Sequence, residues 1–297
     1  MNDLTLFMPG LLPVADAEPA ALMKLLQRGR RMDGADAESV LADALGLARQ
    51  QDWPWAPWLA QQDGLETGEG YWLCCDPVRM GAGMNSLLLH RVQAPGTEES
   101  SLLAAAVEEE LALHWPGARL HVAHPSRWYV RMERAPDLVT QPPERVFHLG
   151  VGACLPGGRD APRLMRLLNG VQVALHDHPV NRQREASGVD PINSVWFWGG
   201  GCLRERLRSP NRVLGGEGGL ARLAARAAHE PFPDALPALR GQVIAFAPPD
   251  WTSLETNWLQ PLLRRLRWGR VGRLRLAFVD ACVEVRPLDL WRIPPPL

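Results

Sequence analysis

The residues best suited to chemistry stand close together in the second half of the chain. They are His178, Asn181, Arg182 and Asn193, and the stretch ends in Gly199–Gly201. An imidazole, two amides, a guanidinium and exposed backbone N–H groups can together hold a phosphate or a carboxylate. The same side chains could instead cap a helix and tie down the loop that follows it. The residue types alone leave both interpretations open.

Four further residues could contribute to an anionic site. Asp76 and Arg79 follow a predicted strand, and the carboxyl ends of strands often carry functional side chains. Asp76 could equally close a turn by accepting from the backbone ahead of it. Arg127 and Arg131 are four apart on another predicted strand, so they point to the same side. They could line an anionic pocket or form a solvated strand face.

Other chemistries have weaker signals. Neither His176 and His178 nor His121 and His124 have the spacing of metal ligands, and we expect no metal site. Residues 216–221 match the pattern Gly-x-Gly-x-x-Ala, but no convincing strand precedes them, so we interpret them as a loop and a helix start. The chain contains no phosphate-binding loop of the Walker type and no Gly-x-Ser-x-Gly nucleophile turn.

The composition is that of a globular protein. Of 297 residues 46% are hydrophobic and 22% charged, and the net charge of −1 gives no argument for nucleic acid or a membrane as partner. The five cysteines are an odd number and widely scattered, which predicts reduced thiols. The apolar run Leu4–Met8 is too short for a signal peptide or a membrane span. We therefore expect a cytoplasmic protein.

Hydrophobic periodicity predicts an α/β fold with two parts. Strands and helices alternate near both ends of the chain, which favours a parallel sheet, whereas the middle has more adjacent strands. We predict a discontinuous α/β core domain from residues 1–69 and 190–297, interrupted by an α+β lobe from residues 70–189. A helix over residues 162–178 should bury one stripe of side chains. The stripe consists of Leu164, Leu168, Val171 and Leu175.

These motifs resemble a known family. His178-Pro179-Val180-Asn181 with Arg184, then Pro191-Ile192-Asn193 and an aromatic strand into Gly199 and Gly201, resemble the archaeal-type, cofactor-independent phosphoglycerate mutases. Over nearly its full length the chain is also similar to the bacterial RpfE-type regulatory proteins, a group distantly related to those mutases. That likeness lies in Met8–Leu12, Asp76–Val78, Arg127–Tyr129 and Trp196–Gly201. The resemblance implies a shortened core sheet like that of the alkaline phosphatase superfamily, with an inserted lobe.

The chain departs from the mutases where they hold two divalent metals. The first strand runs into Met8-Pro9-Gly10, where the family has aspartate-glycine, and His229 is the only histidine after Gly201. Two-metal phosphoryl transfer without such ligands loses nucleophile activation and charge stabilisation. The resemblance therefore implies the architecture of a mutase without its cofactor and its chemistry, that is, a pseudoenzyme.

We therefore expect a non-catalytic, cytoplasmic regulatory protein that binds a small anionic, phosphorylated metabolite between its lobes. The expected ligand-binding residues are Asp76, Arg79, Arg127, Arg131, His178, Asn181, Arg182, Asn193, Gly199, Gly200 and Gly201. One alternative is a divergent phosphomutase or phosphatase whose divalent metals are held by other residues, such as Asp76 and His178. A second is a scaffold that binds a protein partner through a tryptophan-rich surface at Trp53–Trp58.

Overall fold

The computed structural model describes residues 2–8, 10, 20–83, 87–204, 206–216, 218–225 and 229–291. It divides into two compact units, Met1–Leu47 with Arg206–Leu297, and Ala48–Glu205. We call them the first and the second unit. The first unit is discontinuous along the chain, like the expected core domain. Its inner boundaries are Leu47 and Arg206, whereas the expected ones were residues 69 and 190. Residues 48–69 and 190–205 belong to the second unit, because they contain a helix and a strand that pack within its sheet.

The first unit is built on a mostly parallel seven-stranded sheet. Its order is β2-β12-β11-β1-β10-β8-β9. The strands are β1 (Asp3–Phe7), β2 (Arg30–Arg31), β8 (Arg212–Leu214), β9 (His229–Glu230), β10 (Gln242–Phe246), β11 (Arg273–Ala277) and β12 (Cys282–Val285). β1 is parallel to both β10 and β11, whereas β12 is antiparallel to β11 and β2. The predicted parallel core sheet is confirmed.

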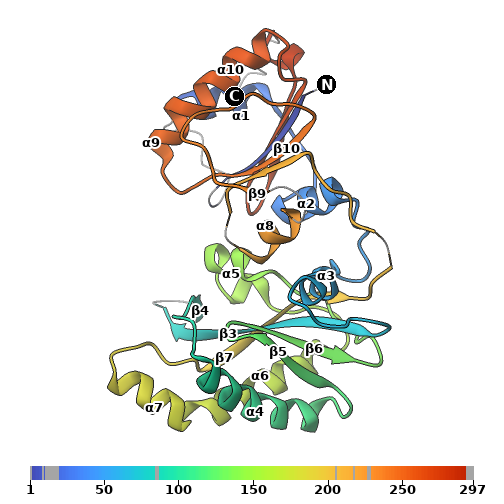
Figure 1. The fold of residues 1–297 in the computed structure, drawn as a ribbon, viewed down its shortest axis with the longest axis vertical. Coiled ribbons are helices and arrows are strands. Elements are labelled where there is room, and N and C mark those ends of the chain that lie inside the picture. Colours follow the sequence, from blue (N-terminus) through green and yellow to red (C-terminus); the bar gives the residue numbers. More distant parts are fainter. Residues whose placement is uncertain are drawn as a thin grey trace. The chain divides into compact units, whose positions relative to one another are not determined.

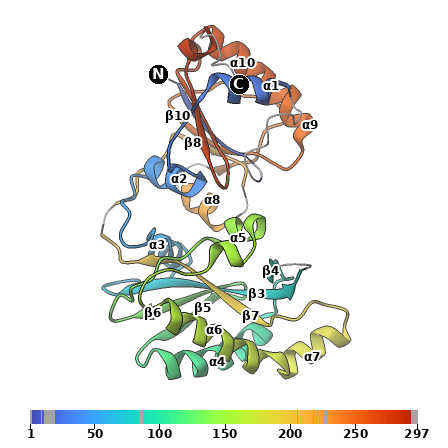
Figure 2. The ribbon, with the colours of Figure 1, turned by 180° about the vertical axis from the view of Figure 1, so that it is seen from behind.

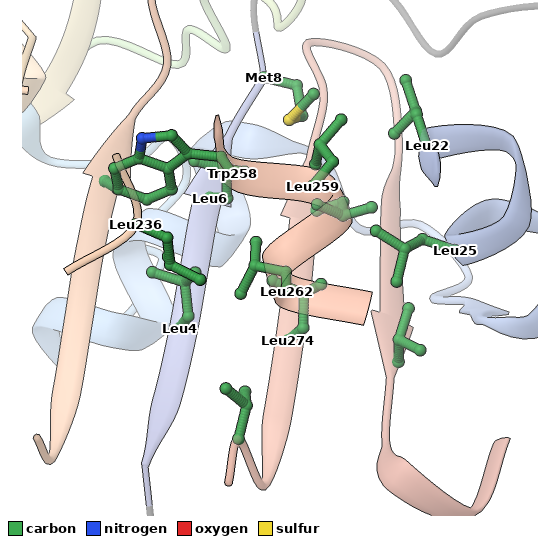
Figure 3. Packing of buried hydrophobic residues seen from close by; sticks show 14 of the residues in the cluster. Leu4, Leu6, Met8, Leu22, Leu25, Leu236, Trp258, Leu259, Leu262 and Leu274 are labelled. Carbon is green, nitrogen blue, oxygen red and sulfur yellow. The ribbon is translucent and has the colours of Figure 1, made fainter. Parts of the chain in front are cut away.

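Leucine-rich helices cover one face of this sheet. The α-helices of the unit are α1 (Ala20–Arg28), α2 (Ala37–Leu45), α8 (Gly219–Ala224), α9 (Trp251–Leu254) and α10 (Gln260–Arg267). A π-helical turn, η2 (Glu255–Leu259), precedes α10, and a 3-10 helix, η3 (Pro287–Trp291), follows β12. Leu4 and Leu6, alternate residues of β1, belong to the same buried cluster as Leu22 and Leu25 of α1 and Leu262 of α10 (Figure 3). Burial of these side chains stabilises the unit by about 1.5–3 kcal/mol per residue.

The second unit is built on an antiparallel sheet. Its strands are β3 (Tyr71–Ala82), β4 (Leu87–His90), β5 (Arg119–His124), β6 (Arg127–Met132) and β7 (Ser194–Gly201). The order is β4-β3-β6-β5, and β7 pairs with β3 along residues 72–78. The aromatic strand β7 was expected in the parallel core. It lies in this sheet because all eight of its residues are buried against β3 and the helices of the second unit.

Helices cover both faces of the second sheet. They are α3 (Trp55–Gln62), α4 (Thr97–His114), α5 (Pro143–Leu149), α6 (Ala161–His176) and α7 (Pro179–Ala186), with a 3-10 turn, η1 (Gly152–Cys154). α4 and α6 lie side by side on one face, and α3 lies on the other (Figures 1 and 2). All four residues of the predicted stripe of α6 are buried, which confirms the periodicity.

The tryptophans at the start of α3 belong to the interior. Trp55 is fully buried and Trp58 is 7% exposed, whereas Trp53 is half-buried. The expected tryptophan-rich surface at this segment is therefore wrong. Trp55 and Trp58 are residues of α3, which packs on β3 and β7, and that packing removes both indoles from solvent.

Candidate functional site

All eleven predicted ligand-binding residues lie in the second unit, but the structure distributes them over three places. Arg79, Asn193 and the residues of α7 gather around the loop 190–193. Asp76 and Arg127 lie on the sheet face that α3 covers, and Arg131 is on the same strand as Arg127. The glycines form the end of β7. Each place has its own set of partners.

The amides around the loop 190–193 are bound to the backbone. Asn181 Nδ2 donates to the carbonyls of Leu175 (2.7 Å) and Ile192 (2.8 Å), and its Oδ1 accepts from the Ile192 N–H (2.9 Å). Asn193 binds both backbone groups of Met80 in the same way, at 2.7 and 2.9 Å. The hydrogen bonds of both side chains thus fix the loop against α6 and β3.

Two further residues of the motif hold α7 in place. His178 is the N-cap of α7, and its Nδ1 accepts from the Val180 N–H at 3.3 Å. Arg184 is 4% exposed and donates to Glu99 Oε2, to the Gln93 carbonyl and to the Asp190 carbonyl. The capping interpretation therefore accounts for most of the polar groups that carry the resemblance.

The basic side chains at this end of the unit remain accessible. Arg79 Nη1 pairs with Asp190 Oδ1 at 2.6 Å, and the two side chains are 39% and 54% exposed. Arg182 is exposed, and its Nε donates to the Asp177 carbonyl at 2.9 Å. Within the described ranges no carboxylate pairs with Arg182. These two guanidinium groups can still meet an anion.

The glycines of β7 make room for protein rather than exposing backbone. Gly199 has φ +71°, and a Cβ there would be 3.1 Å from Trp55 Cβ. A Cβ at Gly200 would overlap the Tyr71 hydroxyl, and one at Gly201 would overlap the ring of Pro54. The glycines let β3 and the start of α3 approach the strand closely.

Replacing Gly200 with alanine should lower the free energy of unfolding by about 2 kcal/mol, because the added methyl group meets buried Tyr71 and Leu73. Urea titration of both proteins measures the difference. Gly152→Ala is the matched control, since a Cβ at Gly152 has nothing within 4 Å. Equal stability of the Gly200 variant and the natural protein would contradict the packing role.

A polar cluster occupies the other face of the sheet. Asp63, which follows α3, accepts from Arg127 Nε at 2.7 Å and from the Tyr129 hydroxyl at 2.6 Å, and its side chain is 4% exposed. Asp76 accepts from Trp198 Nε1 at 2.7 Å. Strand register explains the grouping, because Cys74 pairs with both Tyr129 and Trp198 and Asp76 stands two residues further along β3.

Burial sets the charge state of this cluster. It raises the pKa of Asp76 from 3.8 to about 7, and the nearby carboxylates of Glu144 and Asp63 add to the effect, whereas Trp198 and Arg127 oppose it. Burial also raises the pKa of Glu144, whose Oε2 has no hydrogen-bond partner among the described residues. Asp76 is therefore neutral in mildly acidic solution and about half protonated near pH 7.

The sequence pointed to Asp76 and Arg127 but not to Asp63 or Glu144. The alternation of β6 could have placed Tyr129 beside Arg127, since both point to one side of the strand. Nothing local connects Asp63, which is 64 residues before Arg127, with that face. Because Asp63 neutralises Arg127, this cluster is a poor place for an anionic ligand.

The residues do not fit the two-metal site that the resemblance to mutases would imply. Across the described ranges, no group of three or more His, Cys, Asp or Glu side chains could hold a metal ion. Asp76 is bonded to Trp198, and His178 caps α7. At the carboxyl end of β1, where the mutases have a metal ligand, this chain has Phe7 and Met8, which are both buried and apolar.

Comparisons with known proteins point to the mutases. No protein-family model matches the chain. A 2,3-bisphosphoglycerate-independent phosphoglycerate mutase of Methanothrix thermoacetophila is 33% identical over 97 residues, which are 33% of this chain and 25% of that protein. A probable enzyme of the same description from Geobacter sulfurreducens is 40% identical over 60 residues, 20% of this chain and 15% of that protein. The matched residues thus make up a quarter or less of these curated relatives.

Two solved structures are similar over most of the chain. A cofactor-independent phosphoglycerate mutase from Thermoplasma acidophilum aligns with 96% of this chain and 90% of its own, at 14% identity and a TM-score of 0.38. A protein from Pyrococcus horikoshii aligns with 95% and 86%, at 11% identity and a TM-score of 0.41. The sequence matches make this chain a distant homologue of the cofactor-independent phosphoglycerate mutases.

No helix in the described part of the chain is both long enough and apolar enough to cross a membrane.

Proposed function

We propose that this mutase-related chain is a non-catalytic regulatory protein of the bacterial cytoplasm, like the RpfE-type proteins that its sequence resembles. It needs no cofactor. It binds a small anionic, phosphorylated metabolite through Arg79 and Arg182, and it reports that metabolite to its regulatory target. Of the other predicted residues, Asn181, Asn193 and His178 support this site by fixing the loop 190–193 and α7.

The observation that carries the proposal is the Arg79–Asp190 ion pair at the surface. Pairs between exposed side chains are worth only about 0–1 kcal/mol, so an incoming phosphate can replace the carboxylate of Asp190 at little cost. Arg79 and α7 are attached to the same loop, through Asn193 on one side and Asn181 on the other. A planar guanidinium group binds a phosphate with two parallel hydrogen bonds.

The test is isothermal titration of the full chain with phosphoglycerate, inorganic phosphate and unphosphorylated glycerate. Phosphoglycerate should bind, and the double variant Arg79→Ala/Arg182→Ala should bind at least about tenfold more weakly, because each charged hydrogen bond contributes about 1.5–3 kcal/mol. The control Arg119→Ala/Arg166→Ala removes two exposed arginines of the same unit and should bind normally. Asp190→Ala frees Arg79 from its ion pair and should tighten binding.

Unchanged affinity in the Arg79/Arg182 variant, or no tightening in Asp190→Ala, would contradict this site. Turnover of phosphoglycerate that requires manganese or magnesium and is lost in Asp76→Ala would instead favour the divergent mutase or phosphatase. Protein partners recovered without any small-molecule binding would favour the scaffold.

A further inference from the structure

The outer surface of the first unit carries a feature that the proposed function does not use. α1, α10 and η3 contact one another, and α1 and α10 lie along one face of the seven-stranded sheet (Figures 1 and 2). On α1 and α10 the leucines point inward, where Leu22, Leu25, Leu262 and Leu266 are buried in the cluster that covers the strands. The opposite sides of these helices therefore face solvent. We call this surface the basic layer, and it consists of residues 20–31, 260–272 and 286–291.

The basic layer has a strong excess of positive charge. It contains Lys24, Arg28, Arg30, Arg31, Arg264, Arg265, Arg267, Arg270 and Arg286. Its one acidic residue is Asp289, which is 2% exposed and lies 3.5 Å from Arg30 Nε, and Arg286 pairs with Glu284 of β12 at 2.7 Å. The whole chain has a net charge of −1, so the positive charge is local. The net charge of the whole chain therefore does not reveal the positive charge of the basic layer.

Three arginines at the end of α10 are available to a partner. Arg264, Arg267 and Arg270 are exposed, and none has a carboxylate partner in the described ranges. Arg265 differs, because it donates to the carbonyls of Leu236 and Pro237. Unpaired surface guanidinium groups on one helix and its C-terminal turn form a positive surface that attracts an anionic one.

Large apolar side chains project from the same layer. Trp268 directly follows α10 and is 81% exposed, and Leu288 and Trp291 of η3 are 77% and 74% exposed. The chain contains ten other tryptophans, and four of these are fully buried. Exposed indoles and an exposed leucine on α10 and η3, together with the exposed arginines of α10, have the composition of a membrane-surface segment. Cationic side chains bind headgroups, and Trp and Leu enter the acyl boundary.

We propose that the basic layer binds the surface of an anionic phospholipid bilayer as a peripheral contact. Arg264, Arg267 and Arg270 meet the phosphate headgroups, and Trp268, Leu288 and Trp291 enter the interfacial region. Single-stranded nucleic acid would use the indoles as stacking platforms, but Leu288 offers no ring on which a base can stack. A bilayer uses all three apolar side chains, and it therefore fits the layer better.

The experiment is flotation of the full chain with vesicles of phosphatidylcholine alone and of equal parts phosphatidylcholine and phosphatidylglycerol. The protein should float with the anionic vesicles only, and added salt should weaken binding. Arg264→Gln/Arg267→Gln/Arg270→Gln should bind at least about tenfold more weakly. Trp268→Ser/Trp291→Ser should also bind at least about tenfold more weakly, because interfacial binding scales with buried apolar area.

Two control variants test whether binding depends on the basic layer or on exposed arginines and apolar side chains in general. Arg119→Gln/Arg134→Gln/Arg166→Gln removes three exposed arginines of the second unit, and Leu113→Ser/Val173→Ser removes two exposed apolar side chains there. Both should float like the natural protein. Circular dichroism of every variant should be unchanged, because all these side chains are exposed.

Three outcomes would overturn the proposal. The first is no flotation with anionic vesicles, or flotation that the arginine variant leaves unchanged. The second is retention of a single-stranded oligonucleotide, lost in the same variants, without binding to vesicles. The third is a concentration-dependent dimer that dissociates in Trp268→Ser/Trp291→Ser, which would make a second copy of this chain the occupant.

Discussion

Replacing Asn181 with alanine should lower the free energy of unfolding by about 3–5 kcal/mol. The side chain is 1% exposed and makes hydrogen bonds to Leu175 and to both backbone groups of Ile192. Alanine leaves the carbonyl and the N–H of Ile192 buried without the partner that Asn181 provides, and each such group costs about 1–3 kcal/mol. The Leu175 carbonyl, by contrast, keeps its bond from the His178 N–H. Urea titration followed by circular dichroism measures the loss.

The neighbouring residues of the same motif provide graded controls. His178→Ala removes only an N-cap contact and should cost about 1 kcal/mol. Arg182→Ala changes an exposed side chain and should cost less than about 0.5 kcal/mol. If Asn181→Ala were as stable as Arg182→Ala, the motif would not be the structural tie that its contacts indicate. The contrast separates the residues that hold the loop from the one that we assign to the ligand.

Asp76 should make the stability of the protein fall as the pH rises from about 4 to about 7. Its pKa is raised from 3.8 to about 7 in the folded state, so the folded state binds more protons than the unfolded state in that range. The resulting stabilisation is complete below the unfolded pKa and is lost as the pH passes the folded one. The full effect is of the order of 4 kcal/mol, from about 1.4 kcal/mol per pKa unit.

Asp76→Asn isolates this contribution, because asparagine is neutral at every pH and its Oδ1 can still accept from Trp198. The variant should match the natural protein near pH 4 and be more stable by up to about 4 kcal/mol near pH 8. The exposed control Asp33→Asn should give a difference in stability that does not change with pH. A flat difference for Asp76→Asn as well would mean that Asp76 is ionised throughout.

The groups around Asp76 explain why its charge is disfavoured. Arg127, whose charge lowers the pKa of Asp76, already pairs with Asp63, and Glu144 brings a second buried carboxyl with a raised pKa. The natural protein should therefore lose stability with pH more steeply than Asp76 alone predicts, since burial raises the pKa of Glu144 in the same direction. Double replacement of Asp76 and Glu144 by their amides should flatten the profile further.

Much of the fold could be predicted from local patterns. The strand of Leu4 and Leu6 and the helix stripe from Leu164 to Leu175 follow from the spacing of apolar residues, and the structure contains both. The domain boundaries could not be predicted in this way. The sequence of β7 is compatible with a buried strand in either sheet. Only its pairing with β3, some 120 residues earlier in the chain, assigns it to the second unit.

The candidate site shows the same division. Residue types identified His178, Asn181 and Asn193 as polar groups with a shared role, but they could not separate a ligand from a backbone carbonyl as the partner. Met80, which lies 113 residues before Asn193, supplies that partner. Glycines 199–201 were expected to expose backbone to a ligand, and they instead admit Tyr71, Trp55 and Pro54.

The sequence by itself determined the class of fold, the apolar faces of the helices and strands, and the distant relation to the phosphoglycerate mutases. These depend on periodicity and on runs of neighbouring residues. Only the tertiary structure decided which polar groups are already bonded, which carboxyl has a pKa raised by burial and which tryptophans face solvent. Hydrogen-bond partners, burial and local charge are set by residues far apart in the chain, and they exist only after the chain has folded.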